Sequence, residues 1–190
     1  VDDPDPEPEE TIVFKLSEPT AGITLSADSV HTYSINDNDA AREIDFTIAS
    51  SSGNEDVTPV FLTVRLSVTD PLNPTSADYT VSGGTATAGG DFTLADGTVT
   101  VPANEISTTI QIDIIDDLLY ELNETIEVTL SNPSNANMGT NTVHTYTIFD
   151  NDTKPELEFT IANSNGSEGT TPAFVTVSLS EPSGQVTTAD

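Results

Sequence analysis

The sequence predicts an all-β fold, with immunoglobulin-like sandwich modules of seven antiparallel strands arranged in tandem. Short segments in which apolar and polar residues alternate are separated by turn residues at regular intervals, which is typical of a β-sandwich. Ile110, Ile112 and Ile114, for example, alternate with polar residues, the pattern of a half-buried strand. The predicted strands are 43–49, 60–68, 77–82, 97–101, 107–115, 125–131 and 142–149.

An internal repeat defines the predicted domains. Residues 30–39 return at 143–152 with eight of ten positions identical, and residues 43–59 correspond to 156–172. A repeat of this length indicates whole domains in tandem, since solenoid units are shorter. We therefore expect 1–39 to be the C-terminal part of one module, 40–152 a complete module and 153–190 the N-terminal part of the next. Because neither end segment contains a counterpart of residues 79–114, we expect neighbouring modules or identical chains to order both.

Charge and composition exclude several classes of partner. The chain of 190 residues has 32 acidic and 4 basic residues, a formal net charge of -28. Such a charge makes nucleic acid and anionic membrane surfaces unsuitable partners. The sequence contains no cysteine, and no apolar run approaches the ~20 residues that span a bilayer, so we expect no direct membrane insertion. Its Pro-, Asp- and Glu-rich beginning suggests an internal cut through a longer protein rather than a signal peptide.

An acidic cluster follows the fifth predicted strand. Asp116, Asp117, Glu121 and Glu124 lie within nine residues, and so many carboxylates repel one another unless a cation lies between them. Calcium accepts six to eight oxygen ligands in flexible geometry. A solvated acidic loop is the alternative for one isolated cluster, and adaptation to high salt would give the same overall charge. Acidic clusters that recur at fixed positions along the chain favour a metal.

Several motifs in a fixed order resemble the Calx-β family, the calcium-binding sandwich modules of sodium–calcium exchangers. The resemblance covers 40–152 and rests on these segments: Tyr-Thr-Val at 79–81, Gly-Thr-Ala-Thr-Ala-Gly-Gly-Asp-Phe at 84–92, Gly-Thr-Val at 97–99, Ile-Asp-Asp at 115–117 and Phe-Asp-Asn-Asp at 149–152. It implies Ca²⁺ as the cofactor, bound by loops at one end of the sandwich. The implied ligands are Glu55, Asp91, Asp116, Asp117, Glu121, Glu124, Asp150 and Asp152.

This sequence departs from the family pattern in its number of acids. Asn151, Leu118 and Asn123 stand where acids often occur, which implies about two or three calcium ions per module instead of four. The end segments are expected to repeat the chemistry with their own acidic residues. These are Asp2, Asp3, Glu7, Glu10, Asp37, Asp39 and Glu168.

The sequence does not favour an enzyme. It has two histidines, no cysteine and no nucleophile-elbow motif, so a nucleophile with its base is hard to assemble. The paired carboxylates could serve a glycosidase, but they follow the order of metal ligands. His31 and His144, at equivalent strand positions, are interpreted as packing residues.

Tandem near-identical repeats favour a structural or adhesive region of a secreted or cell-surface protein, such as a stalk, adhesin or extracellular filament. Calcium bound at the module junctions would stiffen the array, and its partners would be neighbouring modules, identical chains, a cell-surface protein or a glycan. Two alternatives stay open. One is a regulatory calcium sensor that controls a partner domain, and the other is an accessory region of a larger extracellular enzyme.

Overall fold

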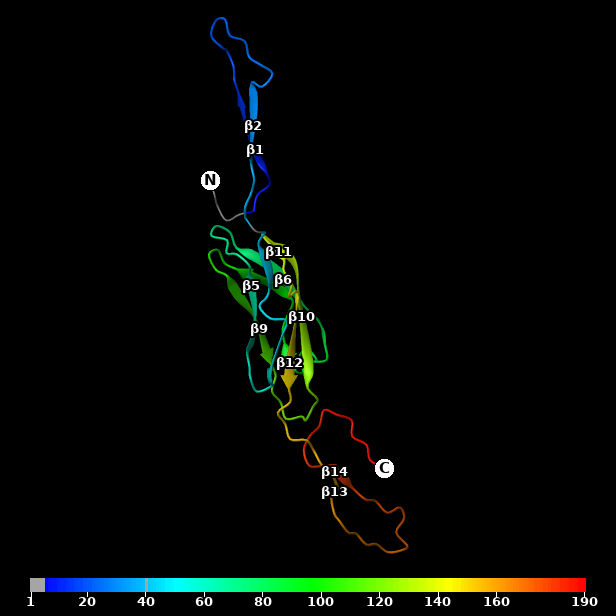
Figure 1. The fold of residues 1–190 in the computed structure, drawn as a ribbon. Helices are drawn as coiled ribbons and strands as arrows, with labels where there is room; N and C mark the ends of the chain where they lie inside the picture. Colours follow the sequence, from blue (N-terminus) through cyan, green and yellow to red (C-terminus); the bar gives the residue numbers. More distant parts are fainter. Residues whose placement is uncertain (1–5, 40) are drawn as a thin grey trace.

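The computed structural model describes residues 6–39 and 41–190, and every regular element in them is a β-strand. A β-sandwich occupies the middle of an elongated molecule, and a two-stranded hairpin extends from each end of it (Figure 1). The N-terminal hairpin consists of β1 (Glu10–Lys15) and β2 (Val30–Ile35), and the C-terminal one of β13 (Leu157–Phe159) and β14 (Val177–Leu179). The predicted fold class is therefore confirmed.

Each layer of the sandwich is a five-stranded sheet. The first sheet has the order β4 (Ser50–Asn54), β12 (Val143–Phe149), β10 (Glu124–Ser134), β6 (Thr75–Gly84) and β8 (Gly97–Val101). The second has the order β11 (Asn137–Met138), β3 (Glu43–Phe46), β5 (Val60–Leu66), β9 (Ser107–Ile114) and β7 (Phe92–Thr93). Neighbouring strands are antiparallel, except that β4 runs parallel to β12 and β11 parallel to β3.

One apolar core lies between the two sheets. The alternating isoleucines of β9 are buried, as the period-two pattern predicts, and Ile126, Val128 and Leu130 of β10 face them from the other sheet. Burying a side chain of this size contributes about 1.5–3 kcal/mol. Gly84 ends β6 with φ +114°, where a Cβ would collide with the carbonyl oxygen of Thr125. The core therefore holds the strands, and the glycine lets β6 end close to β10.

The observed strands differ from the predicted ones mainly at their ends and at the sheet edges. All seven predicted strands form, and within the sandwich β4, β7 and β11 are additional. β3 ends at Phe46, before the predicted end at residue 49, and the chain then crosses to the other sheet as β4. Residues 1–5 and 40 lie outside the described residues, and with them Asp2 and Asp3 of the predicted N-terminal acidic cluster.

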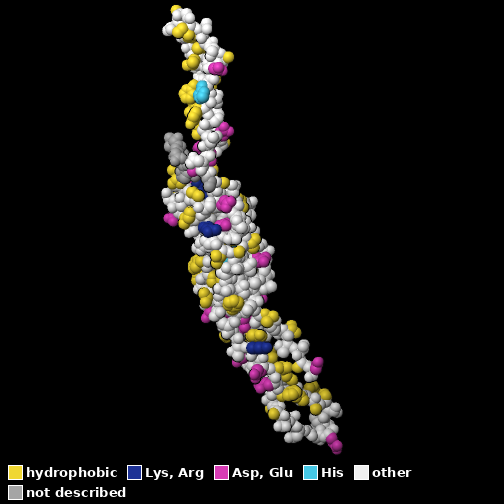
Figure 2. Space-filling view, viewed as in Figure 1, with side chains coloured by type: hydrophobic (Ala, Val, Ile, Leu, Met, Phe, Trp, Pro, Cys, Tyr) yellow, Lys and Arg dark blue, Asp and Glu magenta, His cyan; other side chains and the backbone are white. Residues whose placement is uncertain are grey.

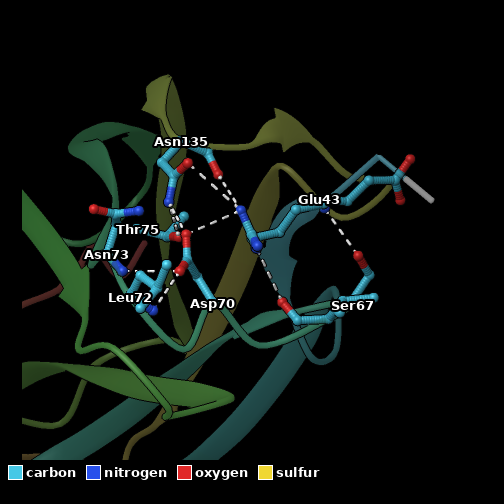
Figure 3. Close-up of polar contacts among 9 residues, drawn as sticks. Glu43, Ser67, Asp70, Leu72, Asn73, Thr75 and Asn135 are labelled. Atoms are coloured by element: carbon cyan, nitrogen blue, oxygen red, sulfur yellow. Dashed lines mark hydrogen bonds and ion pairs between the residues drawn. The ribbon is translucent and has the colours of Figure 1, made fainter. Parts of the chain in front are cut away.

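A buried ion pair closes the end of the sandwich that faces the N-terminal hairpin. The Nη1 atom of Arg42 lies 3.3 Å from Oδ2 of Asp70, with the two side chains 4% and 2% exposed. Asp70 also accepts hydrogen bonds from the Asn135 amide (2.6 Å) and from the backbone N–H groups of Leu72 and Asn73 (both 2.8 Å) (Figure 3). Paired and hydrogen-bonded in this way, both charges are tolerated in the interior.

Exposed apolar side chains gather on both end hairpins (Figure 2). Both hairpins belong to the internal repeat. Each hairpin repeats two strands of the central sandwich, but without the opposite sheet that covers those strands there. Among the described residues, no helix is long and apolar enough to cross a membrane.

Candidate metal centre

Four loops meet at the end of the sandwich that faces the C-terminal hairpin, and the longest joins β9 to β10. This loop starts where the apolar pattern of β9 ends at Ile114, and the N–H of Ile115 donates to the carbonyl oxygen of Asp91 (2.9 Å). The loop turns back where the N–H of Leu119 donates to Oδ1 of Asp117 (2.7 Å). These two bonds place Asp116 and Asp117 beside the loop that carries Asp91.

Glu55 and the segment after β12 form the opposite side of the centre. The N–H of Glu55 donates to the carbonyl oxygen of Phe149 (3.1 Å), continuing the parallel pairing of β4 with β12. The N–H of Asn151 donates to Oε1 of Glu55 (3.2 Å), and its side-chain amide lies 3.4 Å from Oδ1 of Asp116. Asn151 thus connects three loops. From the sequence, Asn151 was interpreted only as a position where related sequences often have an acid. Its position between Asp150 and Asp152 was the signal that could have placed it in the site.

The carboxylates form two groups, each with oxygen atoms within 4.8 Å of one another. The first group is Glu55, Asp117 and Asp152, and the second is Asp91, Glu121 and Glu124. Asp150 lies close to both groups, because its Oδ1 accepts a hydrogen bond from the N–H of Glu121 in the second group (3.1 Å) and its charge acts on Glu55 in the first. Members of both groups and Asp150 line one small hollow.

Burial and mutual repulsion disfavour the charged forms of four of these acids. Burial, with the nearby charges of Asp150 and Asp152, raises the pKa of Glu55 to about 6. Burial, a side-chain contact with Asp91 and the charge of Glu121 raise the pKa of Glu124 to about 7. The same causes, burial first, raise the pKa values of Glu121 and Asp152. A cation at this end of the sandwich would reverse that penalty.

The donor atoms fit calcium. Both groups consist of carboxylate oxygens, the hard ligands that Ca²⁺ prefers. Within the described part of the chain, the buried Oδ2 atom of Asp152 has no hydrogen-bond partner, and an unpaired buried oxygen is costly unless something else engages it. Asp152 belongs to the first group, so a metal ion bound there could engage this oxygen.

All eight residues predicted as ligands therefore lie at the same end of the sandwich. Six fall into the two groups, Asp150 lies between them, and Asp116 is exposed and held by Asn151. Their roles as ligands stay a prediction.

Comparison with known proteins identifies the family. The model of the Calx-beta domain matches residues 37–152, more than half of the chain. The chain belongs to the Calx-β domain family. Over 96 residues it is 33% identical to sodium/calcium exchanger 1 of Felis catus and 32% identical to that of Rattus norvegicus. These matches cover 50% of this chain and 10% of each exchanger.

Solved structures agree with the Calx-β assignment. The Apo-form Calx CBD1 domain is 25% identical with a TM-score of 0.55, over 60% of this chain and 100% of that one. The calcium binding domain CBD12 of CALX1.1 is 26% identical, also with a TM-score of 0.55, over 63% of this chain and 49% of that one. Calcium as the cofactor is thus confirmed for the family, and the matched part of the chain is a calcium-binding module rather than a catalytic domain.

The comparisons correct two predictions. The predicted function, a structural or adhesive region of a secreted protein, is wrong. The relatives are sodium/calcium exchangers, and the matched segment is only a small part of each exchanger. The predicted secreted or cell-surface location is wrong for the same reason. The repeats suggested an array, but they are equally compatible with a few sensor modules in one chain.

Proposed function

We propose that the Calx-β sandwich of this chain is a calcium sensor that regulates a neighbouring part of the same polypeptide. The likeness to sodium/calcium exchangers and to a calcium binding domain supports this proposal. The likeness to exchangers also supports the proposal that this sandwich lies in an intracellular, regulatory segment of a larger chain. The division into modules at 1–39, 40–152 and 153–190 remains part of the proposal, supported by the repeat.

The observation that carries the proposal is the pairing of two carboxylate groups at one end of the sandwich. We assign Glu55, Asp117 and Asp152 to one calcium ion and Asp91, Glu121 and Glu124 to another, with Asp116 and Asp150 as further ligands. Bound calcium would supply positive charge to acids that repel one another. The free energy of the loops therefore depends on calcium concentration, which is the property a sensor requires.

A direct contact offers a route from the centre to the next segment. Tyr120 lies in the β9–β10 loop between Asp117 and Glu121, and its carbonyl oxygen accepts hydrogen bonds from the N–H of Gly184 (3.1 Å) and the hydroxyl of Ser183 (3.4 Å). Calcium that orders the loop would also fix Tyr120. The segment that follows β14, which contains Ser183 and Gly184, is thus the first part of the chain to respond.

A calorimetric titration and a thermal melt of the 190-residue chain test the binding. After treatment with EDTA, calcium is expected to raise the unfolding temperature. A ligand that binds only the folded state adds about 2.7 kcal/mol at a hundred times its Kd. Magnesium should add much less, because it demands a smaller octahedral shell. Equal shifts with calcium, magnesium and sodium at matched ionic strength would reduce the effect to charge screening and contradict the proposal.

Two variants of equal charge locate the binding site. Asp117→Asn should weaken calcium binding at least about tenfold, because it removes a charged ligand. Asp113→Asn removes the same charge from the exposed face of β9 and should leave binding close to that of the parent. Equal affinities for both variants would place the ions elsewhere.

Hydrogen exchange tests the regulatory step separately from binding. Calcium should slow exchange of the Gly184 amide, which donates to Tyr120, and leave Phe159 in β13 unchanged as an internal control. Binding without any change at Gly184 would keep the calcium site but refute this route to the next segment.

A further inference from the structure

β4 leads the chain to Glu55 in the metal centre, yet its own sequence leaves its register poorly defined. The strand reads Ser-Ser-Ser-Gly-Asn, without an apolar side chain, and lies at the edge of its sheet beside β12. Polar and glycine-rich strands specify their pairing register only weakly. A slip of one residue would move Glu55 by about 3.3 Å along β12 and turn its side chain to the other face of the sheet. Contacts outside the backbone pairing must therefore fix the register.

His144 of β12 is buried and uses both ring nitrogens to hold the segment that enters β4. Nδ1 lies 2.9 Å from the carbonyl oxygen of Ile48, and Nε2 lies 2.8 Å from the hydroxyl oxygen of Ser51. A carbonyl oxygen only accepts hydrogen bonds, so Nδ1 carries the proton of the neutral ring and the Ser51 hydroxyl donates to Nε2. The histidine is 2% exposed. If β4 moved, buried polar atoms would lose their partners, which is costly.

A second contact between β12 and β4 supports the same register. A Cβ built on Gly53 would collide with the hydroxyl of Tyr146, so the tyrosine needs a residue without a side chain beside it. A slip of one residue would bring Ser52 or Asn54 to this position, and either side chain would meet the ring. His144 and Tyr146 therefore define one register by two different means, a hydrogen bond and a steric fit.

Glu55 lies on the same face of the chain as the two residues that these contacts hold. Along this segment Ser51, Gly53 and Glu55 are the less exposed positions, and the residues between them are exposed. Directly after β4, the N–H of Glu55 donates to the carbonyl oxygen of Phe149 (3.1 Å), and its Oε1 accepts from the N–H of Asn151 (3.2 Å). The register that Ser51 and Gly53 define is therefore the one that brings the Glu55 carboxylate to the metal centre.

The internal repeat keeps these positions and changes the ones between them. The kept residues are Ser51, Gly53 and Glu55, which return as Ser164, Gly166 and Glu168. The changed residues are Ser50, Ser52 and Asn54, which are replaced by Asn163, Asn165 and Ser167. On the partner strand, His144 and Tyr146 have their counterparts in His31 and Tyr33. The repeat therefore distinguishes the residues that fix the register from the rest of a polar strand.

From these contacts we propose that His144 is a positioning residue for calcium binding: it fixes the register of β4 on β12 and thereby places Glu55 in the first carboxylate group. This inference rests on the proposed calcium function and goes beyond it, because it assigns part of the affinity for one ion to a buried histidine outside the acidic loops. The second group consists of Asp91, Glu121 and Glu124 and takes no residue from β4 or its end. The two ions should therefore respond differently when His144 is replaced.

Calorimetric titration of the full chain with calcium tests this difference between the two ions. His144→Leu keeps an apolar side chain of similar size beside Phe46, whose ring centroid lies 5.4 Å from that of the histidine, but it removes both hydrogen bonds. Replacing a residue that orients a metal ligand costs about tenfold or more in affinity. We expect such a loss for one ion, with the affinity for the other close to that of the parent.

Two further variants separate positioning from a general loss of stability. Val99→Ala leaves a cavity in the same core, on β8 at the edge of the sheet opposite β4, and should lower the unfolding temperature while both calcium affinities stay as in the parent. Ser51→Ala removes only the partner of Nε2 and leaves the His144 ring in place. It should weaken the same ion as His144→Leu, by a smaller factor, and it tests the inference even where His144→Leu does not fold.

A disulfide that requires the native register provides a rescue. The chain contains no cysteine, and Ser52 and Thr147 are Cα partners in the parallel pairing of β4 with β12. Neighbouring strands lie about 4.8 Å apart, which a disulfide can bridge. Ser52→Cys with Thr147→Cys should therefore oxidise readily in EDTA, and less completely when His144→Leu is added. Once formed, the disulfide should return the affinity of the His144→Leu chain for the weakened ion to that of the cross-linked parent, and reduction should remove this gain.

The outcomes distinguish this inference from the proposed function. A parent chain that binds no calcium would refute the calcium function and with it any role of His144 in binding, whereas the disulfide yield in EDTA would still report on the register alone. Where the parent binds calcium, three results would overturn the inference and leave the calcium function intact. These are a His144→Leu chain that binds both ions like the parent, one that loses both ions equally, and disulfide yields that do not depend on His144.

Discussion

Replacing Glu55 with glutamine should raise the stability of the Calx-β sandwich without calcium and lower it with calcium. Burial and the charges of Asp150 and Asp152 raise the pKa of Glu55 from 4.5 to about 6, and each pKa unit is worth about 1.36 kcal/mol. The ionised Glu55 side chain therefore lowers the free energy of unfolding by about 2 kcal/mol at pH 7.5, or by about 1 kcal/mol after screening by solvent and salt. Glutamine removes this cost and can still accept the hydrogen bond from Asn151.

The sign of the pH effect follows from the same pKa. An acid whose pKa is higher in the folded chain destabilises the fold above its folded pKa and loses that effect as the pH falls below its unfolded pKa. The Glu55→Gln advantage without calcium should therefore be largest above pH 6 and vanish towards pH 4.

With calcium the sign of the substitution reverses. If Glu55→Gln weakens calcium binding a hundredfold, calcium at a hundred times the parent Kd adds about 0.4 kcal/mol to the variant and about 2.7 kcal/mol to the parent. The variant then becomes less stable by about 1 kcal/mol, after its gain of about 1 kcal/mol without calcium.

Thermal melts at pH 7.5 in EDTA and in saturating calcium measure both values. A domain of this size shifts its unfolding temperature by about 3–5 °C for each kcal/mol. Glu55→Gln should therefore unfold at a higher temperature than the parent in EDTA and at a lower temperature in calcium. Glu105→Gln changes an exposed glutamate and serves as the control, with small shifts in both buffers. Stabilisation by Glu55→Gln in both buffers would mean that Glu55 is repelled but is not a ligand, and destabilisation in both would make it purely structural.

Two further predictions concern the sandwich itself. Gly53→Ala should destabilise the fold by about 1–3 kcal/mol in urea denaturation through overpacking against Tyr146, and Tyr146→Phe should recover part of the loss; no recovery would mean that the contact is not the cause. Hydrogen bonds from the Asn135 amide and two backbone N–H groups, with the charge of Arg42, lower the pKa of Asp70 to about 2, so its contribution is present above about pH 4 and is lost as the pH falls through 2. Asp70→Asn should therefore lower the unfolding temperature at pH 6 and lose most of this difference at pH 2, as differential scanning calorimetry would show.

The sandwich could be predicted because the alternation of apolar and polar residues in its strands shows which side chains are buried. β9 alternates between apolar and polar residues from Thr109 to Ile114 and β10 from Thr125 to Ser131, and both strands form. β4 has the sequence Ser-Ser-Ser-Gly-Asn, which has no apolar residue and suggests a loop. It becomes a strand only because β12 offers a free edge, and its parallel pairing depends on contacts about 95 residues apart. No local pattern contains that information.

The candidate site was predictable as a set of residues but not as an arrangement. The family motifs place eight acids on loops, and the structure brings all of them to one end. Their division into two groups, and the role of Asn151 as the link between Glu55 and Asp116, depend on how four loops pack together. The function was predicted incorrectly because repetition and acidity describe the module and not the protein around it.

The two ends of the sandwich use carboxylates in opposite ways, and this difference favours a sensor. At one end Asp70 accepts a hydrogen bond from Asn135 and pairs with the buried guanidinium of Arg42, so its charge stabilises the fold above about pH 4. At the other end Glu55 and Glu124 are held near further acids, and their raised pKa values show that the folded chain disfavours their charge. A module selected only for rigidity gains nothing from acids that destabilise it when calcium is low. A module that must respond to calcium gains from them, because the same repulsion that loosens the loops without calcium is what binding removes.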